Sequence, residues 1–452
     1  YAASSLLKQN NSIAFHDMMF AKKASEIEAV IIKNKPEYFV IYDDGFNYLT
    51  KMCLTNMRNA AFEMATIAKK LGCKVIVSSS DATDHSLEYF NNHVDFIIVG
   101  EGEQSLVELI AQLKNKQKNF SAINGLRYPE NEKLIETSGR ENLKNLDSLP
   151  MPAWHLLDVQ PYKKCWLGKY GYFSINIATT RGCPFKCNWC AKPIYGNRYN
   201  SRSPQNVIDE LLWLKEHFHF DHIWFCDDIF GLKPGWVNEF ADLVNAHQLH
   251  LKFKIQSRVD LLLEDHLPDQ KESTIEALSR AGCDEVWLGA ESGSQKILDA
   301  MDKGTKIEQI HRATKLLWSK GIKPCFFLQF GYSGETMDDI KLTMKMLFEL
   351  MPHDIGVSVS YPLPGTKFYE NVKSQMQGKT NWTDSDELAA MFNATFPSGF
   401  YKKLQRYVHY QFRIKKLLES IKKGNMAASL FTLSYKIPLA MYSKFVIQKY
   451  VH

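Results

Sequence analysis

The first hundred residues alternate between short apolar runs and longer stretches in which apolar residues recur every three or four positions. The apolar runs predict buried strands, and the periodic stretches predict helices. Such alternation is typical of a parallel sheet with helices on both faces. We therefore expect a doubly wound, Rossmann-like α/β domain over residues 1–105. Its strands are expected at 12–15, 38–42, 74–77 and 95–99, and its helices at 1–9, 24–33 and 58–71.

Residues 106–170 predict a helix, a small hairpin and a linker. The hairpin is expected to pair 125–128 with 133–137. Pro150 and Pro152 stiffen the linker, because each ring fixes its own φ and restrains the preceding residue.

A second series of strands and helices begins near residue 174. Six βα units with right-handed crossovers predict a partial (β/α)6 barrel over residues 171–372. Catalytic groups of such folds lie at the carboxyl ends of the strands. The strands are expected at 174–178, 222–225, 252–256, 285–288, 324–329 and 356–360.

The alternation of strands and helices ends before residues 373–452, which are expected to form a helical, basic C-terminal region. The whole chain has a net charge of +5, whereas residues 401–452 hold eleven basic residues and one acid, Glu419. We favour a helical cap on the barrel. A membrane-surface helix is the alternative, since apolar residues such as Phe431, Leu439 and Phe445 alternate with lysines. No nucleic-acid partner is expected, because no nucleic-acid-binding motif occurs.

Three of the nine cysteines form a tight cluster, Cys183, Cys187 and Cys190, spaced C-x3-C-x2-C directly after the first barrel strand. Three thiolates on one loop can bind three irons of a 4Fe–4S cluster and leave the fourth iron open. The alternative is a structural zinc site completed by Cys165 or Cys226, although zinc ribbons usually show paired C-x2-C knuckles. Either site requires reduced thiols and indicates a cytoplasmic protein.

The cysteine spacing, together with Trp189 before the last cysteine, resembles the radical S-adenosylmethionine (SAM) superfamily. The doubly wound domain ahead of the barrel resembles the cobalamin-binding subclass, which includes the class B methyltransferases. This resemblance covers about residues 1–375. It implies a 4Fe–4S cluster on the three cysteines, SAM on the open iron, and cobalamin in the first domain. It also implies reductive cleavage of SAM to a 5′-deoxyadenosyl radical.

Further segments extend the resemblance, each at the end of a barrel strand. The resemblance implies that Arg258 meets the SAM carboxylate and that Glu291 and Ser292 contact the ribose. The remaining SAM contacts that it implies are Trp189, Asp228 and Ser257. Residues 361–366 (YPLPGT) resemble the family's segment near the adenine.

In the first domain, the loops after two strands resemble the edge that holds cobalamin in this subclass. The implied contacts are Ser78, Ser79, Ser80, Gly100, Glu101, Gly102 and, over the upper face, Asp44. The first strand of the sheet, with the loop that carries an axial histidine in some cobalamin proteins, is expected to precede Tyr1.

We therefore expect a cobalamin-dependent radical SAM enzyme that methylates an unactivated centre of a small or hydrophobic, lipid-like substrate. The alternatives are a non-methylating cyclisation, rearrangement or oxidation on the same architecture, and a zinc-stabilised binding protein without turnover. An external electron donor such as flavodoxin or ferredoxin is implied. Peripheral contact with the inner membrane face through the basic region is a further alternative. No motif identifies the substrate.

Overall fold

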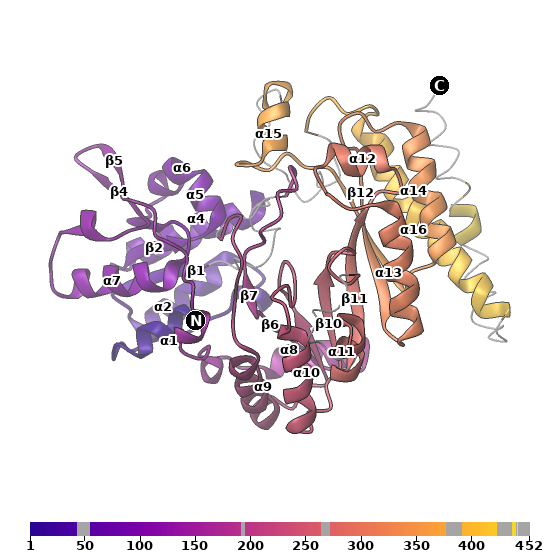
Figure 1. Ribbon diagram of the computed structural model, residues 1–452. Coiled ribbons are helices and arrows are strands. Elements are labelled where there is room, and N and C mark those ends of the chain that lie inside the picture. Colours follow the sequence, from indigo (N-terminus) through magenta and orange to yellow (C-terminus); the bar gives the residue numbers. More distant parts are fainter. Residues whose placement is uncertain are drawn as a thin grey trace.

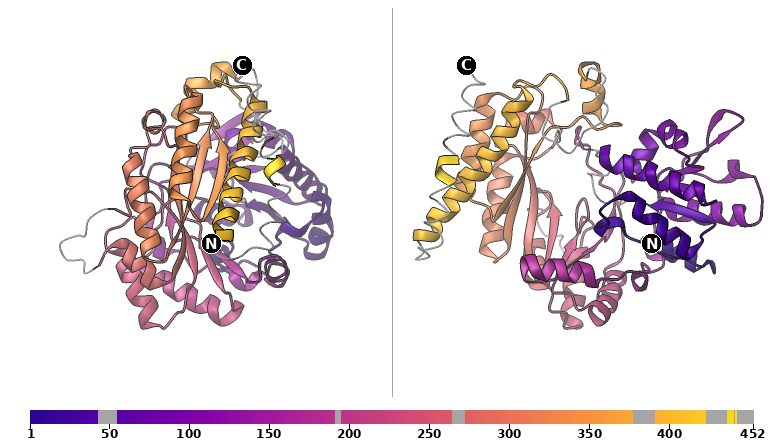
Figure 2. Two further views of the ribbon diagram at one scale, coloured as in Figure 1. Left: turned by 90° about the vertical axis from the view of Figure 1, so that its right-hand side faces the viewer. Right: turned by 180° about the vertical axis from the view of Figure 1, so that it is seen from behind.

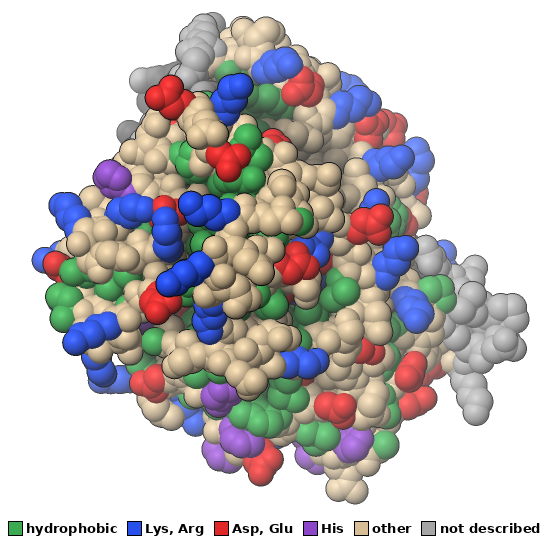
Figure 3. Space-filling model, turned by 90° about the vertical axis from the view of Figure 1, so that its left-hand side faces the viewer, with side chains coloured by type: hydrophobic (Ala, Val, Ile, Leu, Met, Phe, Trp, Pro, Cys, Tyr) green, Lys and Arg blue, Asp and Glu red, His purple; other side chains and the backbone are tan. Residues whose placement is uncertain are grey.

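The computed structural model describes residues 1–42, 55–190, 195–263, 272–376, 391–422, 436–439 and 441. Two α/β units lie side by side, and the long helix α16 lies on the side of the second unit that faces away from the first (Figure 1). The rotated views in Figure 2 show the same order. On the face of the first unit shown in Figure 3, basic and acidic side chains are interspersed.

The first unit contains a five-stranded sheet in the order β1-β2-β3-β4-β5. β1, β2 and β3 are parallel, and the expected hairpin is present as β4 and β5, which continue the same sheet in antiparallel fashion. The strands are β1 Tyr38–Tyr42, β2 Lys74–Ser78, β3 Phe96–Ile98, β4 Leu126–Glu130 and β5 Lys133–Glu136.

The strand expected at residues 12–15 is wrong. This segment has no strand pairing, and the side chain of Phe15 is 50% exposed. A strand gains stability only where its apolar side chains reach a core and its backbone joins a ladder. Ile13 and Phe15 lie outside both cores of this unit, so their apolar character did not predict a strand correctly.

Helices cover both faces of the first sheet, which confirms the doubly wound architecture. One core contains Ile31, Ala65, Val75 and Ile97; the other, on the opposite face, contains Ile76 and Leu109 among others. The helices are α1 Ala2–Leu7, α2 Ile27–Asn34, α4 Thr55–Lys70, α5 Ser80–Asp84, α6 Ser86–Asn91 and α7 Gly102–Lys114.

The second unit is a six-stranded sheet in the order β13-β12-β11-β10-β9-β6, and every neighbouring pair is parallel. This confirms the partial barrel, because consecutive strands lie next to one another without reversal. The strands are β6 Ser174–Ile177, β9 His222–Phe225, β10 Phe253–Ser257, β11 Cys283–Glu291, β12 Lys323–Phe330 and β13 Asp354–Val359. A small ribbon, β7 Thr180–Arg181 with β8 Asn200–Ser201, closes the loop that contains the three cysteines.

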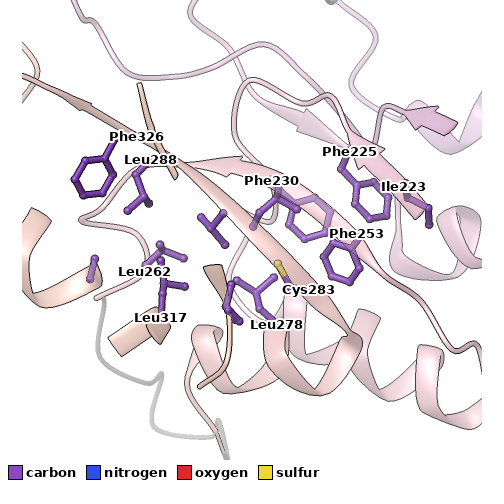
Figure 4. Close-up of a cluster of buried hydrophobic side chains, with 14 of the residues drawn as sticks. Ile223, Phe225, Phe230, Phe253, Leu262, Leu278, Cys283, Leu288, Leu317 and Phe326 are labelled. Carbon is purple, nitrogen blue, oxygen red and sulfur yellow. The ribbon is translucent and has the colours of Figure 1, made fainter. Parts of the chain in front are cut away.

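Helices pack on one face of this sheet and form the main core with it. In Figure 4, Phe225 and Phe253 from the strands lie at one end of this core and Leu317 from a helix lies beside Leu262 at the other, with Leu278 between them. The helices of this unit are α8 Gln160–Tyr170, α9 Pro204–Phe218, α10 Trp236–Ala246, α11 Thr274–Ala281, α12 Gln295–Ala300, α13 Ile307–Ser319, α14 Met337–Leu350 and α15 Lys367–Val372. Single 3-10 turns occur at Met18–Phe20, Ala24–Glu26, Phe120–Ala122, Leu146–Ser148, Trp154–Leu156 and Lys373–Gln375.

The first part of the basic C-terminal region is helix α16, Ser398–Lys422. Phe400, Tyr401 and Phe412 of this helix are buried in the main core. The ammonium groups of Lys415 and Lys416 donate to backbone carbonyls of the barrel. α16 is therefore a packed cap. Of the apolar residues on which the membrane-surface alternative rests, Ile437, Leu439 and Met441 are exposed, whereas Phe431 and Phe445 lie outside the described residues. In the described part of the chain no helix is both long enough and apolar enough to span a membrane.

Candidate cluster and cofactor site

A buried carboxylate fixes the start of the cysteine loop. Asp227, after β9, accepts from the backbone N–H groups of Thr179 and Thr180 at 2.7 and 2.9 Å and from the Thr179 hydroxyl at 2.5 Å. Burial raises the pKa of Asp227 to about 6 despite these bonds. Gly182 follows with φ +80°, and a Cβ there would lie 2.2 Å from the carbonyl oxygen of Arg198. Only glycine can hold the chain in this position.

The three cysteines of the predicted cluster all lie on this loop. Cys183 is buried, and Cys187 and Cys190 are half-buried. Among the described residues, no three His, Cys, Asp or Glu side chains could bind a single metal ion together. A 4Fe–4S cluster makes no such demand, because each cysteine binds a different iron. Three thiols on one loop are the donor set that this cluster requires, and the residues fit it.

Arg258, at the end of β10, lies against the cysteine loop. Its Nη1 is 3.7 Å from the Cys187 sulfur, and its guanidinium lies 3.9 Å from the centre of the Phe185 ring. It also donates to Asp260 at 2.8 Å and to the Lys303 carbonyl at 2.8 Å. Arg258 therefore places a positive charge beside the loop that carries the three cysteines. The predicted contact with the SAM carboxylate stays a prediction.

Glu291, the last residue of β11, forms a buried ion pair with Lys303 at 2.8 Å. The Glu291 carboxylate raises the pKa of Lys303, although burial opposes this. Glu291 has φ +57°, a strained conformation for a residue with a Cβ. A Cβ at Gly289 would lie 2.6 Å from the Lys303 nitrogen, so only glycine at this position leaves room for the ion pair between Glu291 and Lys303. Lys303 also lies 5.9 Å from the Trp189 ring, next to the last cysteine.

The other predicted SAM contacts occupy different environments. Ser292 is fully buried, lies 3.1 Å from the Thr343 hydroxyl and accepts from the Ser294 N–H at 3.1 Å. The hydroxyl of Ser257 donates to the Arg258 carbonyl at 3.3 Å. Asp228 is exposed. The structure thus brings Arg258, Glu291 and Trp189 around the cysteine loop. The contacts of Asp228, Ser257 and Ser292 with SAM stay predictions.

Asn188, between the second and third cysteines, was not expected to matter and proves to be the main anchor of this loop. Its backbone N–H donates to the Met301 carbonyl at 3.0 Å, and its carbonyl accepts from the Phe368 N–H at 2.9 Å. Its amide donates to the Ala300 carbonyl at 2.7 Å and accepts from the Tyr332 hydroxyl at 2.7 Å. These partners lie after three different strands. No sequence signal links them, because the closest is more than 100 residues away.

We expect Asn188→Ala to loosen the loop, because it removes the amide that links the Ala300 carbonyl to the buried Tyr332 hydroxyl. The Tyr332 hydroxyl still donates to the Ala300 carbonyl at 3.1 Å, so the cost is that of the hydrogen bonds lost, about 0.5–1.5 kcal/mol each. Chemical unfolding should therefore show a loss of about 1–3 kcal/mol, and reconstituted protein should retain less iron. Lys186→Ala, at an exposed position of the same loop, is the control. Equal iron retention in the two variants would contradict an anchoring role.

The predicted cobalamin edge lies at the carboxyl ends of β2 and β3. Ser79 caps α5 by accepting from the N–H groups of Asp81 and Ala82 at 3.1 and 3.3 Å. The Ser80 hydroxyl is buried, and no hydrogen-bond partner is found for it among the described residues. A Cβ at Gly102 would lie 2.9 Å from the Ser78 hydroxyl. Small residues and a buried hydroxyl with no described partner fit the approach of a bulky polar ligand. Asp44 lies outside the described residues.

A buried charge cluster joins this edge to the cysteine loop. Arg181, immediately before Gly182, donates to Glu103 at 2.5 Å and lies 3.6 Å from Glu101. The Glu101 carboxylate also accepts from the Leu143 N–H at 2.7 Å. Burial raises the pKa of Glu101. Glu101 therefore contacts the second unit, and its predicted contact with cobalamin stays a prediction. Arg181 lies in the cysteine motif and Glu103 in the segment that resembles the cobalamin edge, but the sequence did not predict the ion pair between them.

The comparisons with known proteins agree with this geometry. Residues 177–347 match the family described as the radical SAM superfamily. An uncharacterized methyltransferase of Pyrococcus horikoshii is 28% identical over 333 residues, which cover 73% of this chain and 70% of that protein. An anaerobic magnesium-protoporphyrin IX monomethyl ester cyclase of Rubrivivax gelatinosus is 26% identical over 294 residues. That match covers 63% of this chain and spans only half of the cyclase.

Two solved structures share the fold of both units. The radical SAM methyltransferase TsrM from Kitasatospora setae, with cobalamin and a [4Fe-4S] cluster bound, superposes with a TM-score of 0.66 over 84% of this chain and 72% of TsrM. The cobalamin-dependent radical SAM enzyme OxsB, with aqua-cobalamin bound, gives a TM-score of 0.70 over 99% of this chain and 69% of OxsB. The sequence identities are 16% and 18%, so these likenesses concern the fold.

Proposed function

We propose that this chain, whose residues 177–347 match the radical SAM superfamily, is a radical SAM enzyme and a cobalamin-dependent methyltransferase. Cys183, Cys187 and Cys190 would hold the 4Fe–4S cluster. The loops after β2 and β3, with Ser80 and Gly102, would hold cobalamin. When bound, the cluster supplies the electron that cleaves SAM, and cobalamin supplies the methyl group that is transferred.

The observation that carries the proposal is the buried contact of Arg181 with Glu103 and Glu101. Arg181 directly precedes the cysteine loop, and the two glutamates flank Gly102 in the predicted cobalamin edge. This contact supports the proposal, because it would hold the two proposed cofactor sites next to each other, as methyl transfer to a substrate between them requires.

The chain's own residues prepare the site in three ways. Asp227 and Asn188 fix the two ends of the cysteine loop through buried hydrogen bonds. Arg258 and Lys303 place positive charge beside it, which attracts a carboxylate. The close approach of Gly182 and Gly289 to their neighbours brings these groups together.

A non-methylating reaction on the same architecture is the second candidate. The similarity to the Rubrivivax gelatinosus cyclase supports it, but that match spans only half of the cyclase. The match to the Pyrococcus horikoshii methyltransferase covers 70% of that protein and favours methyl transfer.

The cobalamin part of the proposal can be tested by binding alone. Wild-type protein incubated with hydroxocobalamin and then desalted is expected to retain about one equivalent, visible by its absorbance. Gly102→Val should lose most of it, because a side chain there would collide with the Ser78 hydroxyl. Gly139→Val is the control, since a Cβ at Gly139 meets no atom within 4 Å. Equal retention by the two variants, or none by wild type, would count against a cobalamin site at this edge.

We further propose a cytoplasmic location and an external electron donor such as flavodoxin or ferredoxin. Both suit a site built on reduced thiols. A small or lipid-like substrate and peripheral membrane contact by the basic C-terminal region belong to the same proposal and rest on its sequence alone.

A further inference from the structure

The inner face of the six-stranded sheet carries aromatic and polar side chains below the cysteine loop. Strand residues alternate between the two faces, and the helix-facing positions include Ile223, Ile255 and Phe326. The positions between them therefore face the inside of the partial barrel. Register places them in adjacent rows, in which Trp224 pairs with Lys254, Gln256 with Trp287, and Phe327 with Gly356.

The aromatic side chains of this face form two contacts. The Lys254 nitrogen lies 4.1 Å from the centre of the Trp224 ring, a cation–π distance. The rings of Trp287 and Phe327 lie 4.8 Å apart with an interplanar angle of 32°. A Cβ at Gly356 would lie 3.2 Å from the Phe327 ring, so glycine leaves room for this pair. The face thus offers broad, rigid aromatic surface.

In the part of the chain that the structure describes, side chains do not fill the space over this inner face. Layers of packed side chains fill the inside of a closed eight-stranded barrel, whereas this six-stranded sheet is open. Here Trp224, Lys254, Trp287 and Phe327 are only half-buried, and Asn176, which pairs with Trp224 on the neighbouring strand, is exposed. The described residues therefore leave accessible space over the aromatic surface.

The positive charge of Lys254 has no carboxylate bound to it in the described part of the chain. Its in-register neighbour Glu285 instead lies 3.8 Å from the ring nitrogen of His353. Desolvation by burial lowers the pKa of Lys254. A half-buried ammonium beside aromatic rings is a favourable partner for an anionic group of a ligand.

We propose that Trp224, Lys254, Gln256, Trp287 and Phe327 form the substrate site and that the substrate is a planar aromatic or conjugated molecule with an acidic group. The rings would stack on Trp287 and Phe327, and Lys254 would bind the acid, a carboxylate or a phosphate. The site is continuous with the cysteine-loop site, because Gln256 lies two residues before Arg258 and Trp287 lies four residues before Glu291 on the same strands. This inference rests on the proposed function for its identification as the substrate site.

Binding of small probes tests the inference without any turnover. Unreduced wild-type protein without SAM would be titrated with 2-naphthoate, 2-naphthyl phosphate and the neutral 2-naphthylmethanol, followed by tryptophan fluorescence and calorimetry. We expect at least one acid to bind about tenfold more tightly than the alcohol, which corresponds to one charge-assisted hydrogen bond. Whichever of the two acids binds more tightly shows whether the site prefers a carboxylate or a phosphate.

Two variants locate the site. Lys254→Met should remove the preference for the acids and leave the affinity for the alcohol unchanged, because the stem of Met covers Trp224 in the same way. Trp287→Leu should weaken the binding of all three probes. Lys252→Met, at an exposed position just before the same strand, is the matched control and should behave as wild type.

The inference would be overturned by the absence of binding, by equal affinity for acids and alcohol, or by an unchanged preference in Lys254→Met. Because none of these readouts needs SAM cleavage, they fail independently of the proposed function. Probe binding with no SAM cleavage would refute the enzymatic proposal and leave an aromatic-acid site.

Discussion

Replacing Cys183, Cys187 or Cys190 by alanine is expected to abolish cluster binding and SAM cleavage. Each thiolate binds a different iron of a 4Fe–4S cluster, so no remaining ligand can compensate for the loss. The effect on the rate should exceed that of any other single substitution in the chain, because no electron reaches SAM without the cluster. Iron and sulfide analysis, visible absorbance and the yield of 5′-deoxyadenosine measure it.

Cys165→Ala provides the control for these variants. Cys165 is exposed on α8, outside the cysteine loop, and its replacement should leave iron content and SAM cleavage unchanged. Retention of a full cluster by any one of the three loop variants would contradict the ligand assignment. Loss of iron in Cys165→Ala would instead implicate this residue as a fourth ligand.

The second large effect is expected on stability. Arg181→Ala leaves Glu103 and Glu101 buried without their cation, and breaking a buried ion pair by removing one partner costs about 3–5 kcal/mol. Because the pair joins the two units, unfolding of the variant should also lose cooperativity. Chemical denaturation followed by fluorescence and circular dichroism measures both effects.

Two further variants separate this ion pair from charge removal in general. Arg280→Ala, which breaks a partly exposed pair with Glu272, should cost about 1 kcal/mol or less. The double variant Arg181→Met/Glu103→Met should be more stable than Arg181→Ala, since no buried charge at position 103 remains unpaired. If Arg181→Ala and Arg280→Ala are equally stable, the contact between the units has no energetic importance.

The sequence predicted the barrel well because its strands are parallel and buried. Such strands read as continuous apolar runs, and all six expected strands are present within a few residues. The strand predicted at 12–15 was wrong because its two apolar residues, Ile13 and Phe15, are not buried in either core of the first unit. A local apolar pattern does not show whether a residue reaches a core.

The candidate site was predictable only where a local motif carries it. Cys183, Cys187 and Cys190 lie within eight residues of one another, so their spacing is visible in the sequence. The hydrogen bond between Asn188 and Tyr332 spans 144 residues, and the ion pair between Arg181 and Glu103 spans 78. Such contacts arise when strand ends converge in the folded chain, and one sequence contains no signal of that convergence. The aromatic inner face of the six-stranded sheet could not be predicted either, because the sequence pattern identifies Trp224 and Trp287 only as residues of strands.

The central claim is that the two units hold a cluster and cobalamin for methyl transfer from SAM. Its most direct test is anaerobic reconstitution with iron, sulfide and hydroxocobalamin, followed by reduction with SAM and chromatography of the products. The account predicts retained cobalamin together with both 5′-deoxyadenosine and S-adenosylhomocysteine. 5′-Deoxyadenosine alone would favour the non-methylating alternative. Bound zinc in place of iron, with neither product formed, would contradict the account.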